Sequence, residues 1–109
     1  MSYEVITSEN FARELKKLSK KYISLRQEVF ELGENLRKEP NLGTPIGKDC
    51  YKIRLAIKSK GKGKSGGARV ITCVLAVQES VVLLSIYDKS EHDAIEDKEL
   101  ERLLKEIFS

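Results

Sequence analysis

The spacing of apolar residues changes from a helical to a strand-like period near the middle of this 109-residue chain. In the first half, apolar residues recur every three or four positions, which is the period of one face of a helix. After residue 50 they alternate with polar residues, as on a strand with one buried face. One change of period, with no internal repeat and no linker, predicts a single α+β domain over residues 1–109.

The first half predicts a short strand at residues 3–7 followed by two helices. Ser8 is a suitable N-cap for the first helix, because its side chain can accept a backbone N–H of the first turn. The apolar stripe of this helix is Phe11, Leu15, Leu18 and Tyr22. The stripe of the second helix is Leu25, Val29, Leu32 and Leu36. This helix must end near Glu39, because Pro40 disfavours helical geometry in the residue before it. The two helices are therefore expected to form an antiparallel hairpin.

The second half predicts three strands and one helix. Residues 40–50, with two prolines and two glycines, are expected to form a loop. Strands are expected at 51–58, 68–77 and 81–87, and a final helix is expected to begin at Ile95 or Asp97. The order β-α-α-β-β-β-α predicts a small antiparallel sheet with helices packed on it.

The net charge of +3 conceals a strong segregation of charge along the chain. Residues 48–72 contain eight basic residues and one acidic residue, Asp49, whereas residues 88–109 contain eight acidic and four basic residues. A basic middle segment of this kind indicates a surface that faces a polyanion.

Three of these bases, Lys52, Arg54 and Lys58, project from one side of the strand predicted at 51–58. Arg69 opens the next strand and is expected to lie beside Arg54 or Lys58. Like charges so close repel one another unless an anion bridges them. Asp49 is the one acid nearby in the sequence, so we predict an anion site on this face.

Between these strands, three lysines alternate with glycines: Lys60, Lys62 and Lys64. They are expected to follow the phosphate chain of a nucleic acid together with Lys58. The alternative is a solvated loop whose lysines increase solubility. A phosphate-binding P-loop is excluded, because Lys58 stands where that pattern needs glycine and a strand, not a helix, follows.

Tyr87 and Lys89, at the end of the third predicted strand, approach the basic face from its other edge. Tyr87 could stack on a base or cap the core. His92, next to Glu91, could transfer protons or lie on the surface.

Several classes of protein are not favoured. No apolar run is long enough for a membrane helix, and residues 1–4 do not begin a secretion signal, so a cytoplasmic location is expected. Cys50 and Cys73 lack the spacing of metal ligands and are expected to be reduced thiols in the core. No carboxylate cluster lies on the basic face. We therefore expect no metal, no cofactor and no small-molecule substrate.

Three segments in order resemble the RelE/HigB toxins of bacterial type II toxin–antitoxin systems. They are Asp-Cys-Tyr-Lys-Ile-Arg-Leu (49–55), Gly-Lys-Ser-Gly-Gly-Ala-Arg-Val-Ile-Thr (63–72) and Leu-Leu-Ser-Ile-Tyr-Asp-Lys-Ser-Glu (83–91). The resemblance implies a microbial-RNase-like sheet and a ribosome-dependent mRNA endonuclease. Its partners would be mRNA, the ribosome and a cognate antitoxin.

The resemblance assigns catalytic positions to Lys52, Arg54, Arg69 and Lys89. The family's C-terminal tyrosine corresponds to Ile95, which cannot transfer a proton, and Tyr87 is the candidate to replace it. Metal-free cleavage would proceed by attack of the 2′-hydroxyl on phosphorus, leaving a 2′,3′-cyclic phosphate. Arg54 and Arg69 could clamp the phosphate, and Lys52 or Lys58 is the candidate base.

Two alternative functions remain at this point. A ParE-like toxin of the same fold would inhibit DNA gyrase by binding it, although the dense basic face weighs against this. A non-catalytic RNA-binding relic would keep RNA binding without growth arrest.

Overall fold

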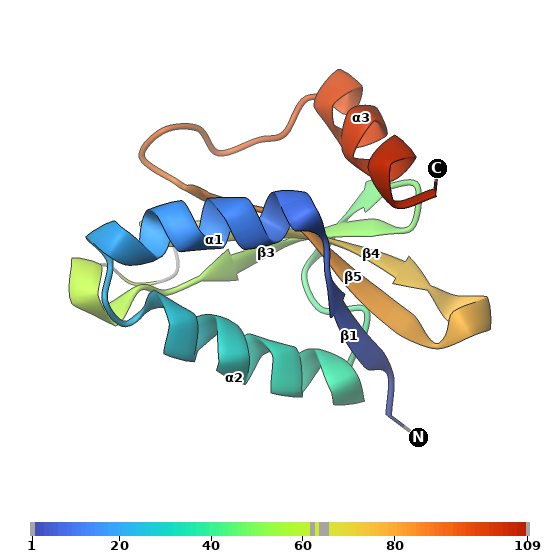
Figure 1. Ribbon diagram of the computed structural model, residues 1–109, viewed down its shortest axis with the longest axis horizontal. Coiled ribbons are helices and arrows are strands. Elements are labelled where there is room, and N and C mark those ends of the chain that lie inside the picture. The colour runs from blue at the N-terminus through green and yellow to red at the C-terminus, as the bar shows by residue number, and fades with distance from the viewer. Residues whose placement is uncertain (1, 62, 64–65, 109) are drawn as a thin grey trace.

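A sheet with the strand order β1-β5-β4-β3-β2 forms the centre of the computed structural model, which describes residues 2–61, 63 and 66–108 (Figure 1). The strands are β1 (Glu4–Thr7), β2 (Thr44–Gly47), β3 (Cys50–Leu55), β4 (Ala68–Leu75) and β5 (Ser80–Asp88). The α-helices in these ranges are α1 (Glu9–Lys21), α2 (Leu25–Lys38) and α3 (Asp97–Phe108). Single 3₁₀ turns, η1 (Lys58–Lys60) and η2 (Ala76–Gln78), precede β4 and β5. The α+β class, the helical hairpin and the C-terminal helix are as predicted.

The ends of the first two helices follow the signals in the sequence. The Ser8 hydroxyl accepts a hydrogen bond from the backbone N–H of Phe11 at 3.1 Å, so Ser8 is the N-cap of α1. The second helix ends at Lys38, with Glu39 as its C-cap directly before Pro40. Both results confirm the predicted boundaries.

Helices cover both faces of the sheet. The apolar stripes of α1 and α2 pack on one face in a core that includes Phe11, Leu25, Leu36, Ile53 and Val70. The third helix packs on the opposite face, where Leu100 and Leu103 contact a second apolar cluster with Cys50, Ile71, Cys73 and Leu84. The basic residues Lys52, Arg54 and Arg69 lie on the α3 side of the sheet, because they alternate with residues of the first core.

The N-terminal strand differs from the antiparallel pairing predicted for the sheet. β1 pairs with β5 in parallel, with Glu4 opposite Ser80 and Thr7 opposite Leu83. Strands β2, β3, β4 and β5 pair antiparallel with their neighbours, as predicted. Since β1 and β5 are far apart in sequence, their relative direction is set by the intervening helices and strands and not by a hairpin turn.

The prediction of a loop over residues 40–50 was wrong, because this segment contains β2. Lys48 and Asp49 have φ angles of 58° and 61°. Positive φ at both central residues is the geometry of the two-residue hairpin turn that matches strand twist. The turn brings Gly47 opposite Cys50, and Thr44 lies opposite Lys52.

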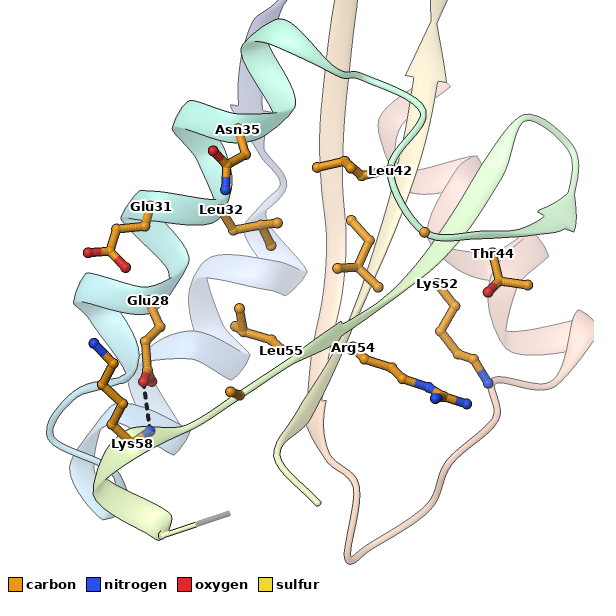
Figure 2. Close-up of a pocket in the computed structure, with 13 residues that line it drawn as sticks. Glu28, Glu31, Leu32, Asn35, Leu42, Thr44, Lys52, Arg54, Leu55 and Lys58 are labelled. Carbon is orange, nitrogen blue, oxygen red and sulfur yellow. Dashed lines mark hydrogen bonds between the residues drawn. The ribbon is translucent and has the colours of Figure 1, made fainter. Parts of the chain in front are cut away.

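The third strand ends at Leu55, three residues earlier than predicted. The backbone N–H of Lys58 donates to Glu28 Oε2 on α2 at 2.7 Å (Figure 2). This hydrogen bond holds the chain near α2, where it forms η1 instead of continuing β3. Ile57 is still buried, as the alternation of apolar residues predicted. No helix in the described ranges is long and apolar enough to cross a membrane.

Candidate active site

Arg54, Arg69 and Tyr87 form a row across three adjacent strands. Arg54 on β3 lies opposite Arg69 on β4, and Arg69 lies opposite Tyr87 on β5. The expected position of Arg69 beside Arg54 is therefore confirmed. Lys52 precedes Arg54 by two residues and projects from the same side of β3, as Figure 2 shows. The fold thus brings four of the five candidate catalytic residues together.

The four side chains differ in exposure. Arg54 is exposed and Lys52 is partly exposed, whereas Arg69 and Tyr87 are only 2% and 5% exposed. A buried guanidinium requires hydrogen-bond partners, because an unpaired buried charge is strongly destabilising. Arg69 Nη1 donates to the Ala68 carbonyl at 3.1 Å, and a carboxylate partner comes from the loop between β5 and α3.

Asp93 in that loop contacts three residues of the site. Its Oδ1 accepts a hydrogen bond from Arg69 Nε at 2.8 Å. Its backbone oxygen accepts from Lys52 Nζ at 3.1 Å and from the Tyr87 hydroxyl at 3.4 Å. The hydrogen bond from Arg69 holds the pKa of the Asp93 carboxyl below its usual range, and the charges of Lys52 and Lys89 act in the same direction. The face therefore binds a carboxylate where we expected it to bind an external anion.

The ring of Tyr87 is stacked on the imidazole of His92, with 4.0 Å between ring centroids and 19° between planes. Burial raises the pKa of the Tyr87 hydroxyl to about 12, and the nearby Asp93 charge adds to this effect. The phenol is thus protonated at neutral pH and can donate a proton or a hydrogen bond. We had considered that Tyr87 could stack on a nucleic-acid base, but in the structure its ring stacks on His92 of the same chain.

Lys60, which we expected to contact RNA, is bound to a buried carboxylate. Its ammonium group pairs with Asp88 Oδ1 at 2.5 Å, and the Tyr22 hydroxyl donates to Asp88 Oδ2 at 2.6 Å. The backbone N–H and hydroxyl of Ser90 also donate to Asp88. Burial alone would raise the pKa of Asp88, but these hydrogen bonds outweigh it and lower the pKa well below its usual range. This cluster fixes the end of β5 next to Tyr87.

Lys58 does not lie on β3 with Lys52 and Arg54, contrary to our expectation that the three share a strand face. It lies in η1 at the end of a groove of about 690 Å³ between α2 and β3 (Figure 2). Glu28 and Glu31 line this groove on the α2 side, whereas the Lys52 and Arg54 side chains on β3 point away from α2. The Lys58 side chain is exposed.

The remaining predicted residues lie at the edge of the site or outside the description. Lys89 is exposed, and its backbone N–H donates to the Gly67 carbonyl at 3.0 Å beside the start of β4. Lys62 and Lys64 lie outside the described residues. In the part of the chain that the structure describes, no three His, Cys, Asp or Glu side chains come together as a metal site would require.

Asp93 is the residue that the sequence analysis missed. Acids from the C-terminal third reach the basic segment, where Asp93 pairs with Arg69, Asp88 with Lys60, and Glu101 with Lys48. The expectation that Asp49 is the one acid near the basic face was therefore wrong. The opposite net charges of residues 48–72 and 88–109 indicated that the two segments could pair, but they did not identify the individual ion pairs.

The fold and the site define a small α+β protein whose sheet carries Lys52, Arg54 and Arg69 on one face. The sequence profile of the family described as "RelE toxin of RelE / RelB toxin-antitoxin system" matches residues 4–107. The chain belongs to this RelE toxin family. A search of curated protein sequences finds no match.

Solved structures of RelE toxins have the same fold. One is E. coli RelE in the free state with two arginines replaced by alanine, at 20% identity and a TM-score of 0.61, covering 97% of this chain and 94% of that one. Another is the RelBE2 toxin–antitoxin complex of Mycobacterium tuberculosis, at 20% identity and a TM-score of 0.59, covering 81% and 99%. The intact E. coli RelBE complex matches at 26% identity and a TM-score of 0.51, covering 80% and 96%.

Proposed function

We propose that this toxin is a metal-independent endoribonuclease that cleaves mRNA on the ribosome and so inhibits translation in the cytoplasm. The observation that carries the proposal is the row of Arg54, Arg69 and Tyr87 with Lys52 beside it. Two guanidinium groups and one ammonium group on a small area suit a phosphodiester whose charge increases in the transition state. Membership of the RelE family supports the same conclusion.

The proposed reaction follows from what each group can do. The 2′-oxygen attacks phosphorus and loses its proton to a base, while the bond to the 5′-oxygen breaks. Arg54 and Arg69 bind the non-bridging oxygens of the phosphorane. Tyr87, protonated at neutral pH, gives its proton to the departing 5′-oxygen. The products are a 2′,3′-cyclic phosphate and a 5′-hydroxyl.

Lys52 is the better of the two lysines considered as base, because Lys58 lies in η1 away from the row. Lys89 at the end of β5 contributes positive charge to the same site. Lys58 remains a proposed RNA contact through its exposed side chain, with Lys62 and Lys64. Lys60 is left out of this set because its ammonium group is engaged by Asp88.

We also propose that a cognate antitoxin binds this protein and silences it. The M. tuberculosis and E. coli relatives were solved as complexes with their RelB antitoxins. Either acidic antitoxin segments would cover the basic face with Lys52, Arg54 and Arg69, or an antitoxin helix would pack near α3. Binding of the first kind should weaken as salt concentration rises.

The test is controlled expression in a bacterium, with growth measured and the 5′ ends of ribosome-associated mRNA mapped. The native chain should arrest growth and produce new 5′ ends within ribosome-bound messages. Arg54→Gln should reduce cleavage by about 10²–10³-fold, as loss of one transition-state donor does. Arg54 is exposed, so this variant should fold.

The matched control is Arg37→Gln on α2, another exposed arginine, which pairs only weakly with Glu34 at 4.0 Å. It should retain full toxicity. Growth arrest with intact mRNA and blocked replication would point to a gyrase inhibitor instead. RNA binding without growth arrest would point to an inactive relic. Equal toxicity of Arg54→Gln and Arg37→Gln would contradict the site.

A further inference from the structure

The loop from Lys89 to Glu96 closes over the site through two residues. Asp93 accepts hydrogen bonds from Arg69, Lys52 and Tyr87, and His92 stacks on the ring of Tyr87. These contacts engage three members of the site at once. They leave Arg69 with 2% of its side chain exposed, whereas Asp93 is 52% exposed. The closed loop thus limits access to the innermost cation of the site.

A carboxylate resembles a phosphate in the way it binds arginine. The carboxylate is planar and the phosphate is tetrahedral, but in each the negative charge is shared by oxygen atoms that accept hydrogen bonds from the guanidinium edge. The Nε edge of Arg69 donates to Asp93 Oδ1, so a phosphate oxygen would compete for the same position. RNA and the closed loop therefore cannot both occupy it.

The loop is anchored outside the site at its two ends, and between them it contacts the site through His92 and Asp93. At its start, Ser90 donates two hydrogen bonds to the buried Asp88. Near its end, Ile95 packs against the apolar cluster under α3. Between these anchors the side chains of His92 and Asp93 are exposed apart from their contacts with the site. Movement of a few residues would uncover Arg69 without disturbing the sheet or α3.

We propose that Asp93 is an internal competitor of the RNA phosphate, and that the loop Lys89–Glu96 is a lid which substrate must displace. This inference rests on the proposed function, because it concerns regulation of the same site. An open state that is only partly populated lowers apparent RNA affinity by the fraction that is open. The Asp93 carboxylate is half exposed, so its removal should tighten RNA binding by a modest factor of about 3–10.

The experiment measures binding of a fluorescent RNA oligonucleotide with 2′-deoxy substitutions, which removes the attacking hydroxyl and prevents cleavage. Fluorescence anisotropy at fixed salt gives the dissociation constant of the full chain. We expect Asp93→Asn to bind about 3–10-fold more tightly than the native chain. The matched control is Glu96→Gln, which removes the same charge from the same loop and should change affinity less than 2-fold or so.

A double-mutant cycle separates the lid from general charge effects. If Asp93 acts by blocking Arg69, its substitution should matter much less when Arg69 is replaced by glutamine. Equal gains for Asp93→Asn and Glu96→Gln would overturn the proposal, as would weaker binding by Asp93→Asn. Absence of RNA binding by the native chain and by Asp93→Asn would contradict the proposed function itself.

Hydrogen exchange gives an independent readout with inorganic phosphate as the probe. Bound ligand usually slows amide exchange, but a displaced lid should exchange faster. Phosphate should therefore accelerate exchange at residues 91–94 of the native chain while leaving β4 and β5 protected. Slower or unchanged exchange at these residues in saturating phosphate would also overturn the proposal.

Discussion

Arg54 lies directly opposite Arg69, so two like charges face each other across neighbouring strands. The Val74 N–H donates to the Asp49 carbonyl, which makes Asp49 and Val74 a hydrogen-bonded pair. Pair types alternate along an antiparallel ladder, so Arg54 and Arg69 occupy a non-hydrogen-bonded position, where side chains are closest. Such a pair destabilises the sheet and favours a bound anion.

This arrangement predicts that Arg54→Gln stabilises the fold while it impairs function. Relief of the repulsion should raise the free energy of unfolding by about 0.2–1 kcal/mol in low salt. Urea denaturation of both proteins measures this, with Arg37→Gln as the control that should change little. Sulfate should stabilise the native chain more than Arg54→Gln. A less stable Arg54→Gln protein would mean that the two arginines do not repel.

The Asp88 cluster predicts a loss of stability in acid. The folded-state pKa of Asp88 lies below its usual value near 4, so its contribution is present above about pH 4 and is lost as pH falls further. Asp88→Asn should remove about 3–5 kcal/mol at neutral pH, because Lys60 then stays largely buried without its partner. Tyr22→Phe should cost about 1–2 kcal/mol.

Denaturation curves at several pH values check this prediction. The native chain should lose stability between about pH 4 and pH 2 more steeply than Asp88→Asn. Glu34→Gln, on an exposed and distant pair of charges, serves as the control. Parallel pH profiles for the native chain and Asp88→Asn would show that the carboxylate is not held in its charged form.

Tyr87 should ionise near pH 12, because burial and the Asp93 charge raise its pKa to about that value. The difference between ultraviolet titrations of the native chain and Tyr87→Phe isolates this phenol. A raised pKa means that the stability contributed by Tyr87 is complete below about pH 10 and declines from pH 10 to 12. Ionisation of Tyr87 near pH 10 would contradict its burial.

The same raised pKa has a catalytic consequence. Tyr87→Phe should slow RNA cleavage by about 10²–10⁴-fold if the phenol protonates the leaving oxygen. The rate of the native chain should show no alkaline loss due to Tyr87 between pH 6 and 9, roughly three or more units below its pKa of about 12. Substrate affinity should change little, which distinguishes proton transfer from a binding role.

The hairpin turn before β3 predicts a stabilising double substitution. Lys48 and Asp49 both have positive φ, which costs non-glycine residues free energy, whereas Asn-Gly is the favoured pair for this turn. Lys48→Asn with Asp49→Gly should raise the free energy of unfolding by about 1 kcal/mol. The lost contact from Lys48 to Glu101 is exposed and contributes little.

Lys48→Ala is the matched control, since it removes the same ion pair but retains the unfavourable backbone. Thermal or urea unfolding should place it close to the native chain. A double variant no more stable than Lys48→Ala would show that the backbone angles cost little here.

Much of the fold could be predicted because local chemistry determines it. Ser8 caps α1, and Pro40 limits α2, which ends at Lys38. The alternation from Tyr51 to Leu55 determines which side chains lie on each face of β3. Failures occurred where distant groups act. Glu28 on α2 ends β3 by accepting the Lys58 N–H, and no pattern around Lys58 reveals that carboxylate. The turn at Lys48 and Asp49 lacks the glycine that would have indicated β2.

The site was predictable to the same extent. Alternation placed Lys52 and Arg54 on one face, and the start of the next strand placed Arg69 beside them. The position of Asp93 depends on the path of the polar loop between β5 and α3. Loops have no regular spacing of apolar residues from which such a path could be predicted. The sequence therefore showed that residues 48–72 are basic and residues 88–109 are acidic, but not which side chains form ion pairs.

The parallel pairing of β1 with β5 joins residues that are 76 positions apart, Glu4 and Ser80. During synthesis, 79 residues must be made before β5 begins, and β5 is the strand that pairs with β1 in the described part of the sheet. Tyr87 and Asp93 emerge later still. A growing chain therefore lacks both its finished sheet and its complete site until residues as far as Asp93 have been made.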